Sequence, residues 1–256
     1  MEITFLGTGT SQGVPIIGCD CEVCRSMDYR DKRLRTSIHI KTDDDQSIII
    51  DSGPDFRQQV LRENIRQLDG LIFTHQHKDH TAGMDDIRGF YFLNNMKPIE
   101  LYGTTSVFEQ LKQEYSYIFA ENKYPGVPSV NLNEIEKNKP FNIGKTTIEP
   151  VQVWHYKLPV MGFKINKFAY ITDVNKIDTD QLEKLKGLDV LIIDALQRTQ
   201  HISHFTLDQA VELCNNLQPK TAYLTHMGHK IGFHSDLEKE LPDYIKPAFD
   251  GLVLSI

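Results

Sequence analysis

Three histidines and an aspartate lie within six consecutive residues of this chain. His75, His77, Asp79 and His80 stand in the segment LIFTHQHKDHTAG, directly after an apolar run that is typical of a buried strand. Imidazole and carboxylate groups are suitable ligands for Zn²⁺ and also for Mn²⁺ or Fe²⁺. His75 and His77 alternate with Gln76 and so point the same way, whereas Asp79 and His80 lie past the bend and can serve a second ion. The segment therefore predicts a two-metal centre; the alternative is a polar surface loop that happens to be rich in histidine.

Three of the four cysteines form a second group of metal ligands. Cys19, Cys21 and Cys24 stand in the fragment GCDCEVC, too close together for an ordinary set of disulfides. Three thiolates leave a tetrahedral zinc one ligand short, and His229, three residues beyond His226, is the natural candidate for the fourth. Because four protein ligands leave no open position for a substrate or water, we expect this zinc to be structural. Three reduced cysteines in a loop are the alternative.

Other polar residues of interest share one position relative to the expected strands. Each follows an apolar strand directly, and these residues are Asp51, His75, His155, Asp173 and His226. In layered α/β proteins, residues that leave strand ends gather in loops on one edge of a rigid scaffold. Taken alone, each of these residues is more simply a cap or a satisfied polar group. The ordered set favours metal ligation.

The elements that must position these side chains can be read from apolar patterning. Strands are expected at residues 2–6, 36–41, 47–51, 70–74, 99–102, 146–153, 161–172, 189–193, 221–225 and 251–255. Amphipathic patterns predict helices at residues 54–68, at residues 105–119 and after Thr206. Residues 121–145 are the longest expected linker. Strands and helices are interspersed, so we expect an α/β protein, with two packed sheets and helices on the outer faces, in a single domain of residues 1–256.

The segment HQHKDH resembles the HxHxDH signature of the metallo-β-lactamase superfamily, and the order of the remaining motifs, from FLGTG to the last histidine, is that of the family. The resemblance implies a four-layer αββα fold and a dinuclear metal site. It further implies that His155 is the third ligand of the first metal, that Asp173 bridges both metals and that His226 completes the second. Asp51 matches an acidic residue of the family that orients a ligand histidine, with a turn-forming aspartate as the alternative.

The cysteine group and His229 are similar to a Cys₃His zinc site of one subfamily, which contains the phosphoribosyl 1,2-cyclic phosphate phosphodiesterase of the carbon-phosphorus lyase pathway. His204 opens the segment HFTLDQA, a match to the HxT-type motif of the phosphodiesterase branch. The resemblance implies that His204 stabilises the transferring phosphoryl group or protonates the leaving oxygen. A histidine at a helix entry that bonds only to backbone is the alternative.

The expected activity is therefore hydrolysis of a small or cyclic phosphodiester. The cofactors are two catalytic divalent metals, Zn²⁺ or Mn²⁺, which activate a hydroxide, and one structural Zn²⁺. Asp79 and Asp173 would orient the hydroxide, and His204 would supply the proton. The sequence leaves open the natural substrate, the native metal and the oligomeric state, a homodimer included.

Several histidines and one cysteine receive other interpretations. His201 and His234 either line the mouth of the pocket or, more simply, are solvated loop residues. His39 alternates with isoleucines in a strand and is structural, and Cys214 falls on the apolar face of the last clear helix. The glycines of FLGTGTS lack the lysine of a nucleotide-binding loop, so we expect a tight turn beside the metals.

Composition bears on the rival functions. A net charge of −7 argues against a broad surface that binds nucleic acid. His155 and Asp173 are only 18 positions apart, too few for the tRNA-binding arm of an RNase Z-like endonuclease. Three further rivals are a protein similar to the pyrroloquinoline-quinone biosynthesis protein B, a thioesterase or lactonase, and a metal-stabilised binding module without turnover. No apolar run is long enough to span a bilayer and no leader is evident, so we expect a cytoplasmic protein without membrane partners.

Overall fold

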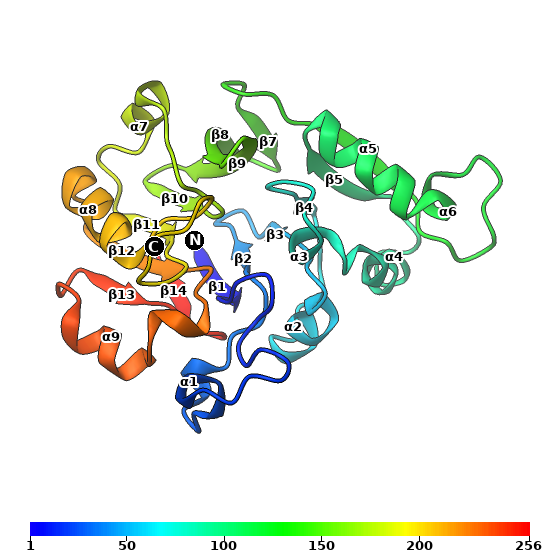
Figure 1. Ribbon diagram of the computed structural model, residues 1–256. Coiled ribbons are helices and arrows are strands. Elements are labelled where there is room, and N and C mark those ends of the chain that lie inside the picture. The colour runs from blue at the N-terminus through cyan, green and yellow to red at the C-terminus, as the bar shows by residue number, and fades with distance from the viewer.

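The computed structural model describes residues 1–256 and contains two seven-stranded mixed sheets (Figure 1). The strands of the first sheet are β1 (Glu2–Gly7), β2 (Ser37–Lys41), β3 (Ser47–Ile50), β4 (Gly70–Ile72), β5 (Ile99–Gly103), β6 (Val130–Glu134) and β14 (Val253–Ser255). The strands of the second are β7 (Phe141–Ile143), β8 (Thr146–His155), β9 (Leu158–Ile165), β10 (Phe168–Ile171), β11 (Val190–Asp194), β12 (Thr221–Thr225) and β13 (Ile245–Pro247). The orders are β14-β1-β2-β3-β4-β5-β6 and β13-β12-β11-β10-β9-β8-β7.

Nine α-helices accompany the sheets. They are α1 (Glu22–Arg25), α2 (Phe56–Arg62), α3 (Lys78–Thr81), α4 (Arg88–Leu93), α5 (Thr105–Glu114), α6 (Ser116–Phe119), α7 (Thr179–Lys184), α8 (Leu207–Leu217) and α9 (His234–Glu240). In Figure 1, α2, α4 and α5 lie on the side of the first sheet, and α7, α8 and α9 lie on the side of the second. None of the helices combines the length and the apolar character that a bilayer crossing needs.

Three buried apolar clusters separate four layers. One joins α2, α4 and α5 to the first sheet, one lies between the two sheets, and one joins the second sheet to α8 and α9. Strand β3 shows how the sequence produces this arrangement, because Ile49 packs toward the helices while Ile48 and Ile50 pack toward the other sheet. A strand that is covered on both faces reads as a continuous apolar run rather than an alternating one. The expected αββα fold of the α/β class is confirmed.

The direction of the strands brings the site residues to one edge. Strands β3 to β6 are parallel to one another, and so are β10 to β13. β8 runs in the direction of β10, because both pair antiparallel with β9. The carboxyl ends of these strands are where ligand-binding loops of layered α/β proteins form.

Some element boundaries differ from the predictions. The single strand expected at 161–172 is a hairpin of β9 and β10, with Asn166 in the left-handed conformation at its turn. The expected linker at 121–145 contains β6 and β7, each of which is one edge strand of its sheet. The helix expected at 54–68 ends at Arg62, and the helix expected at 105–119 is divided at Tyr115.

Other expectations are met. Thr206 and Gln209 form the capping box of α8, as their spacing predicts. Cys214 is fully buried, and burial raises the pKa of its thiol to about 12. His39 lies in β2, where its Nε2 is 2.8 Å from the Ser47 hydroxyl, and it plays a structural part.

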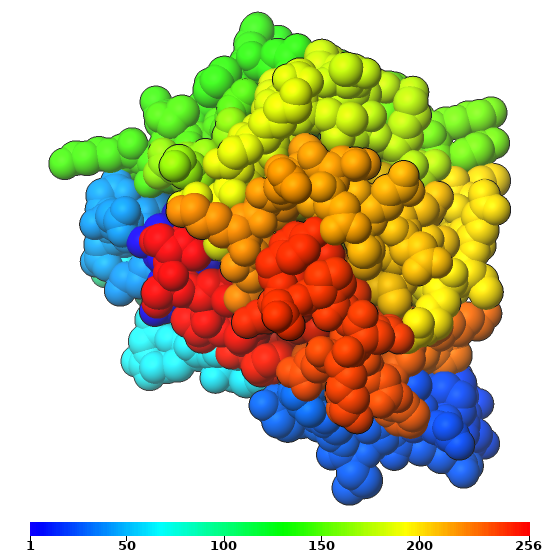
Figure 2. Space-filling view, turned by 90° about the vertical axis from the view of Figure 1, so that its left-hand side faces the viewer, coloured from blue at the N-terminus to red at the C-terminus, as the bar shows by residue number.

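The two ends of the described chain lie side by side. β1 and β14 are antiparallel neighbours, and backbone hydrogen bonds of 2.9 Å run in both directions between Met1 and Ile256. Figure 2 shows the last residues, in red, against the dark blue atoms of the first strand.

Candidate metal centres

The histidine-rich segment forms a turn that leads from β4 into α3. His77 is the N-cap of α3, so Asp79 and His80 lie in the first turn of the helix while His75 lies in the approach to it. The ring of His75 is centred 4.5 Å from that of His77 and 4.2 Å from that of His80. The structure thus brings these four side chains together within one short stretch of backbone.

His155 and Asp173 reach the same place from the second sheet. The His155 ring, at the end of β8, is centred 5.2 Å from that of His77 and 5.9 Å from that of His75. Asp173 follows β10, and its Oδ1 lies 4.0 Å from Nε2 of His75. These four residues are the set that the sequence assigns to the first metal.

The set assigned to the second metal is more compact. Asp79, His80, Asp173 and His226 each offer one ligand atom, and these atoms lie within 4.8 Å of one another. Oδ2 of Asp173 is 3.1 Å from Nε2 of His80 and 3.3 Å from Nε2 of His226. Since one oxygen of Asp173 faces each set, this carboxylate stands between them.

The donor atoms of these two sets fit divalent cations. Nε2 of His75, of His80 and of His226 is buried and has no hydrogen-bond partner, although nearly all buried polar atoms in proteins have one. Burial lowers the pKa of His75 far below its usual range, so its ring is neutral and has a free lone pair. Burial alone would lower the pKa of His80 too, but Asp173, Asp79 and Asp51 raise it well above its usual value. A cation competes with that proton for the same nitrogen.

Asp51 combines the two roles considered for it. Its Oδ2 lies 2.6 Å from Nδ1 of His80, and the carboxylate also accepts hydrogen bonds from the N–H and the hydroxyl of Thr74. The contact directs Nε2 of His80 toward Asp79 and Asp173. At the same time Asp51 has a φ of 66°, so it also makes the turn that leaves β3.

Left-handed backbone recurs at the strand ends of this site. Asp173 has a φ of 51° and His226 a φ of 56°, in addition to Asp51. Residues other than glycine adopt this region rarely, although Asp and His do so more readily than most. Strained conformations of this kind cluster at functional sites, where surrounding contacts hold them in place.

Asp194 is a residue of this site that sequence reasoning missed. It ends β11, and its Oδ2 lies 3.2 Å from Nδ1 of His204 while its Oδ1 lies 3.5 Å from Nδ1 of His226. The same Oδ2 accepts a hydrogen bond from the N–H of Phe205. A signal for it exists, because Asp194 follows the apolar run VLII as Asp51 follows SIII.

His204 faces the metal-ligand sets. Its ring is centred 4.5 Å from that of His155 and 4.8 Å from that of His226, and its Nε2 lies 4.0 Å from Oδ1 of Asp173. With Nδ1 directed at Asp194, Nε2 is left for a substrate. His204 is also close enough to His155 and Asp173 for the three to share an ion.

The two histidines of uncertain role have different outcomes. The exposed His201 lies beside the site, with its ring centred 5.2 Å from that of His204. His234 is buried at the first residue of α9, where its N–H donates to Asp31 and its ring packs on Phe249. Both expectations for His234, a place at the pocket mouth and a solvated loop, are therefore wrong. Its partners are 203 residues and 15 residues away in the chain, so the sequence around it does not reveal its burial.

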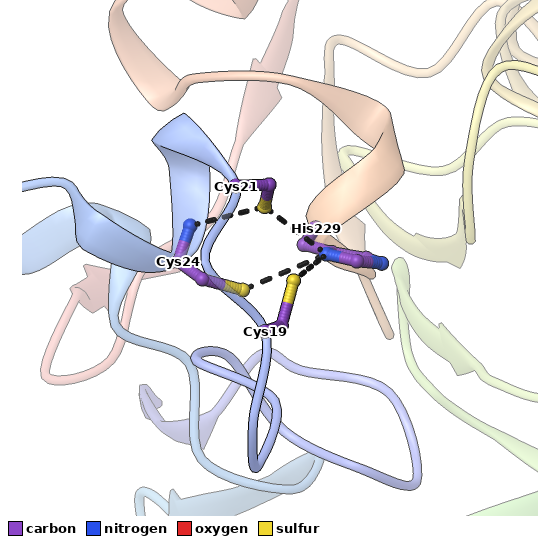
Figure 3. Close-up of side chains that lie close together, drawn as sticks. All are labelled: Cys19, Cys21, Cys24 and His229. Atoms are coloured by element: carbon purple, nitrogen blue, oxygen red, sulfur yellow. Dashed lines mark hydrogen bonds between the residues drawn. The ribbon is translucent and has the colours of Figure 1, made fainter.

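The cysteine group assembles around His229 (Figure 3). The sulfurs of Cys19, Cys21 and Cys24 lie 3.3, 3.3 and 3.5 Å from Nδ1 of His229. A tetrahedral zinc with ordinary bond lengths would separate sulfur and nitrogen ligands by about 3.6 Å. The donor set and its spacing therefore fit a zinc ion with four protein ligands.

The glycines near the N-terminus serve close packing. A Cβ on Gly9 would lie 2.6 Å from the carbonyl oxygen of Arg33, and one on Gly7 would lie 2.0 Å from that of Arg35. The turn itself comes later, where the N–H of Gly13 donates to the carbonyl of Thr10. The segment borders the loop after His226, because the N–H of Met227 donates to the Thr8 carbonyl.

Comparison with known proteins agrees with this fold. A model of the β-lactamase superfamily domain matches residues 46–227. An octanoyltransferase of Porphyromonas gingivalis is 38% identical over 253 residues, which is 98% of this chain and 51% of that protein. The chain thus spans about half the length of this relative.

Two solved structures extend the comparison. A diphosphatase from the PhnP family is 37% identical, with a TM-score of 0.92, and the alignment covers 99% of this chain and 96% of that one. Zn²⁺-bound PqqB from Methylobacterium extorquens, 17% identical with a TM-score of 0.79 over the full length of both chains, shares the fold. Since the family model matches most of this chain and the PhnP-family structure matches nearly all of it at 37% identity, this chain belongs to the metallo-β-lactamase superfamily.

Proposed function

We propose that this protein is a hydrolase that cleaves a small phosphodiester. The observation that carries the proposal is His204, which Asp194 holds by its Nδ1 while Nε2 lies 4.0 Å from the candidate bridging carboxylate of Asp173. A proton donor at this place suits the departure of an alkoxide, which is a poor leaving group unless it is protonated. The HxT-type motif that contains His204 resembles that of phosphodiesterases.

Two divalent cations, Zn²⁺ or Mn²⁺, would complete the site. His75, His77, His155 and Asp173 would hold one of them, and Asp79, His80, Asp173 and His226 would hold the other. Bound there, they would supply Lewis acidity toward a phosphate oxygen and a nucleophilic water at neutral pH. A zinc on Cys19, Cys21, Cys24 and His229 would be structural.

The chain's own groups would move the protons. The carboxylate of Asp79 is ionised, because His80 and His226 lower its pKa against the opposing effect of burial. Asp79 and Asp173 can therefore accept hydrogen bonds from the attacking water and orient it, and the proton that this water loses passes to solvent. As the oxygen of water bonds to phosphorus, the bond to the leaving oxygen breaks and Nε2 of His204 donates a proton to that oxygen. Asp194 stabilises the positive charge on the imidazolium before the transfer.

A diphosphate is the second candidate substrate. The observation in its favour is the structure from the PhnP family, a diphosphatase at 37% identity. The two linkages share an ionised phosphorus centre that carries an oxygen leaving group. They differ in the acid they require, since a leaving phosphate is a weaker base than an alkoxide and needs less protonation.

Turnover by the purified, metal-loaded protein tests the proposal. The panel contains bis-p-nitrophenyl phosphate, ribose 1,2-cyclic phosphates, 2′,3′-cyclic nucleotides and a disubstituted diphosphate, with a thioester and a lactone beside them. We expect hydrolysis of bis-p-nitrophenyl phosphate and of at least one diester with an alkyl leaving group. Cleavage of the thioester or lactone alone would overturn the proposal, and no turnover at all would indicate a binding module.

Replacement of His204 tests its role separately. His204→Ala should leave the metal content unchanged and lower kcat on an alkyl-leaving diester by about 10²–10⁴, the usual contribution of a positioned acid. The loss should be smaller for p-nitrophenyl leaving groups and for a diphosphate. His201→Ala, on the neighbouring exposed ring, is the matched control. If His204→Ala lost metal, the residue would be a ligand.

A further inference from the structure

Asn175 ties together three loops that carry candidate site residues. Its Oδ1 accepts a hydrogen bond of 2.7 Å from the N–H of Tyr156, and its Nδ2 donates one of 3.1 Å to the carbonyl of Ile202. Asn175 itself lies two residues after Asp173. One side chain therefore fixes the turn between β8 and β9, and the loop before α8, to the loop that follows β10.

The two residues held by Asn175 border the histidines of the site. Tyr156 directly follows His155, and Ile202 comes two residues before His204. The rings of these histidines are centred 4.5 Å apart. A second tie joins the same loops, because Nδ1 of His155 lies 2.9 Å from the carbonyl of Ser203. Tyr156 and Ile202 are thus close in sequence to His155 and His204, and the two loops that carry them are bonded to each other.

Both side chains are large, apolar and exposed. Tyr156 is 51% exposed and Ile202 is 66% exposed. Single exposed apolar side chains are common on protein surfaces and need no explanation by themselves. Here both belong to the loops that carry His155 and His204, and the candidate ligands of the two-metal site are all histidine and aspartate. An organic group attached to the phosphate would find large apolar neighbours on this pair of loops.

The backbone of Tyr156 gives an independent indication. Tyr156 and Lys157 form the two-residue turn between β8 and β9, and Tyr156 has a φ of 58°. Such turns favour Asn and Gly, because these residues adopt positive φ at little cost. A bulky aromatic residue in this conformation is unusual and is held by the contact with Asn175. A tyrosine at this position therefore costs more conformational free energy than an asparagine would.

We propose that Tyr156 and Ile202 form a binding surface for the organic substituent of the phosphodiester, and that the surface selects substituents with a flat aromatic ring. The inference rests on the proposed phosphodiesterase function and names its substrate class. A ring can stack on Tyr156 or pack on the aliphatic side chain of Ile202. Nζ of Lys157 lies 5.3 Å from the centre of the Tyr156 ring, and Tyr156 remains half exposed.

A pair of substrates with one leaving group tests this selection. Methyl p-nitrophenyl phosphate and benzyl p-nitrophenyl phosphate both release p-nitrophenolate and differ only in the substituent that stays on phosphorus. We expect the wild-type protein to prefer the benzyl ester in kcat/KM by about tenfold to a hundredfold, the effect of one aromatic stacking contact. The preference should appear in KM rather than in kcat, because the ring lies away from the bonds that change.

The variants remove the surface without straining the turn. Tyr156→Asn deletes the ring and suits the positive φ, and Ile202→Ala shortens the second side chain. Each should reduce the benzyl-to-methyl ratio of kcat/KM at least threefold, and the double variant should bring it close to one. Tyr156→Phe should keep the ratio. Tyr124→Ala, which removes an 81% exposed tyrosine from a distant loop, is the matched control.

The outcomes separate the two levels of the proposal. If the wild-type protein hydrolyses both esters and the ratio is unchanged in Tyr156→Asn and Ile202→Ala, the binding surface is refuted while the phosphodiesterase function stands. If the wild-type protein hydrolyses neither ester, the proposed function fails, and the selection fails with it.

Discussion

Asp194 lies beside two histidines of the site. Its carboxylate faces Nδ1 of His204 and Nδ1 of His226 at 3.2 and 3.5 Å. The hydrogen bond to His204 favours the tautomer with the proton on Nδ1, so that Nε2 is directed into the site. We therefore treat Asp194 as a positioning residue for His204.

The variant Asp194→Asn tests this role. An amide cannot balance the positive charge of an imidazolium, so kcat on an alkyl-leaving diester should fall by about 10- to 100-fold. The alkaline limb of the pH–rate profile, where the acid loses its proton, should move to lower pH. The measurements are steady-state kinetics across pH and metal content by elemental analysis. Asp189→Asn, at the other end of the same strand region, is the control. An unchanged pH profile in Asp194→Asn would contradict the assignment.

His39 links stability to pH at a place far from the metal ligands. Burial lowers the pKa of its imidazole to about 4. A group whose pKa is lower in the folded state than the unfolded value near 6.5 stabilises the fold above that value, and this stabilisation is lost as the pH falls toward 4. Between pH 7 and pH 5, the free energy of unfolding should therefore decrease in both proteins, but less in His39→Gln. The difference between the two decreases should be up to about 2 kcal/mol.

Denaturant unfolding of both proteins at the two pH values measures this difference. Protonation of the metal ligands affects both proteins equally and cancels in the comparison. Equal losses of stability in the two proteins would show that His39 charges freely in the folded state.

Some of the site residues could be predicted from the sequence and others could not. The end of an apolar run marks the end of a strand, so the sequence alone shows that His155, Asp173 and His226 each follow a strand. Because residues that follow strands gather at one edge of a layered α/β fold, these three side chains could be predicted to lie close together. The same rule applies to Asp194, which directly follows the strand expected at 189–193. The burial of His234 depends on Asp31, 203 residues away, and no local pattern contains that information.

At the scale of elements, one loop connects the two candidate metal centres. It runs from His226 to Gly232 and includes His229. Arg33, a fully buried residue, donates to the carbonyls of Gly228 and Gly232 and pairs with Asp31. The position of His226 therefore depends on contacts made further along the same loop.

Cys21→Ser tests this connection. We expect the loss of one zinc per chain and a lower Tm, because structural zinc sites contribute directly to folding free energy. Affinity for the cation held by His226 should also fall, since the loop is no longer fixed at His229. Titration with a metal-sensitive dye and thermal unfolding provide the two readouts.

The neighbouring exposed residue gives a matched control for that experiment. Asp20→Ser changes a side chain that is 81% exposed and pairs only with Arg25, so zinc content should be unaffected. Unchanged zinc content and Tm in Cys21→Ser would refute the structural site.

The elements themselves were predictable where local signals are strong. Helix α8 has a capping box and a complete apolar stripe, and both are local. Edge strands β6 and β7 are short, and several of their residues are exposed or half-buried, so they carry no continuous apolar run. The helix that ends at Arg62 is followed by Asn64 in the left-handed conformation, and the apolar residues beyond it pack from a loop. Apolar periodicity alone does not show whether such residues belong to the helix or to the loop that follows it.

At the scale of the whole molecule, charge and shape argue for a small substrate. The chain has 28 basic and 35 acidic residues. Capture of a long nucleic acid requires many phosphate contacts from Lys and Arg over a wide surface. Of the lysines between residues 121 and 145, Lys137 and Lys139 lie between β6 and β7, at the edges of the sheets. Lys145 lies in the turn after β7, and Lys123 lies in the loop between α6 and β6.

We expect the protein not to mature precursor tRNA under conditions in which it cleaves small diesters. A 3′-processing assay at matched metal concentration measures this, with bis-p-nitrophenyl phosphate as the positive control. Efficient 3′ cleavage of the tRNA without activity on small diesters would reverse the proposed substrate class.

The pairing of Met1 with Ile256 places the two ends of the described chain next to each other. A linker of a few residues would join these ends without disturbing β1 or β14, and the chain could then be opened elsewhere. The turn of Pro125 and Gly126 is a suitable place for the cut, because Pro125 is exposed and the backbone of the turn is not part of either sheet. We expect such a circular permutant to keep the thermal stability and metal content of the parent. The same geometry would let the domain be inserted as a unit into a surface loop of another protein, entering and leaving at almost the same point.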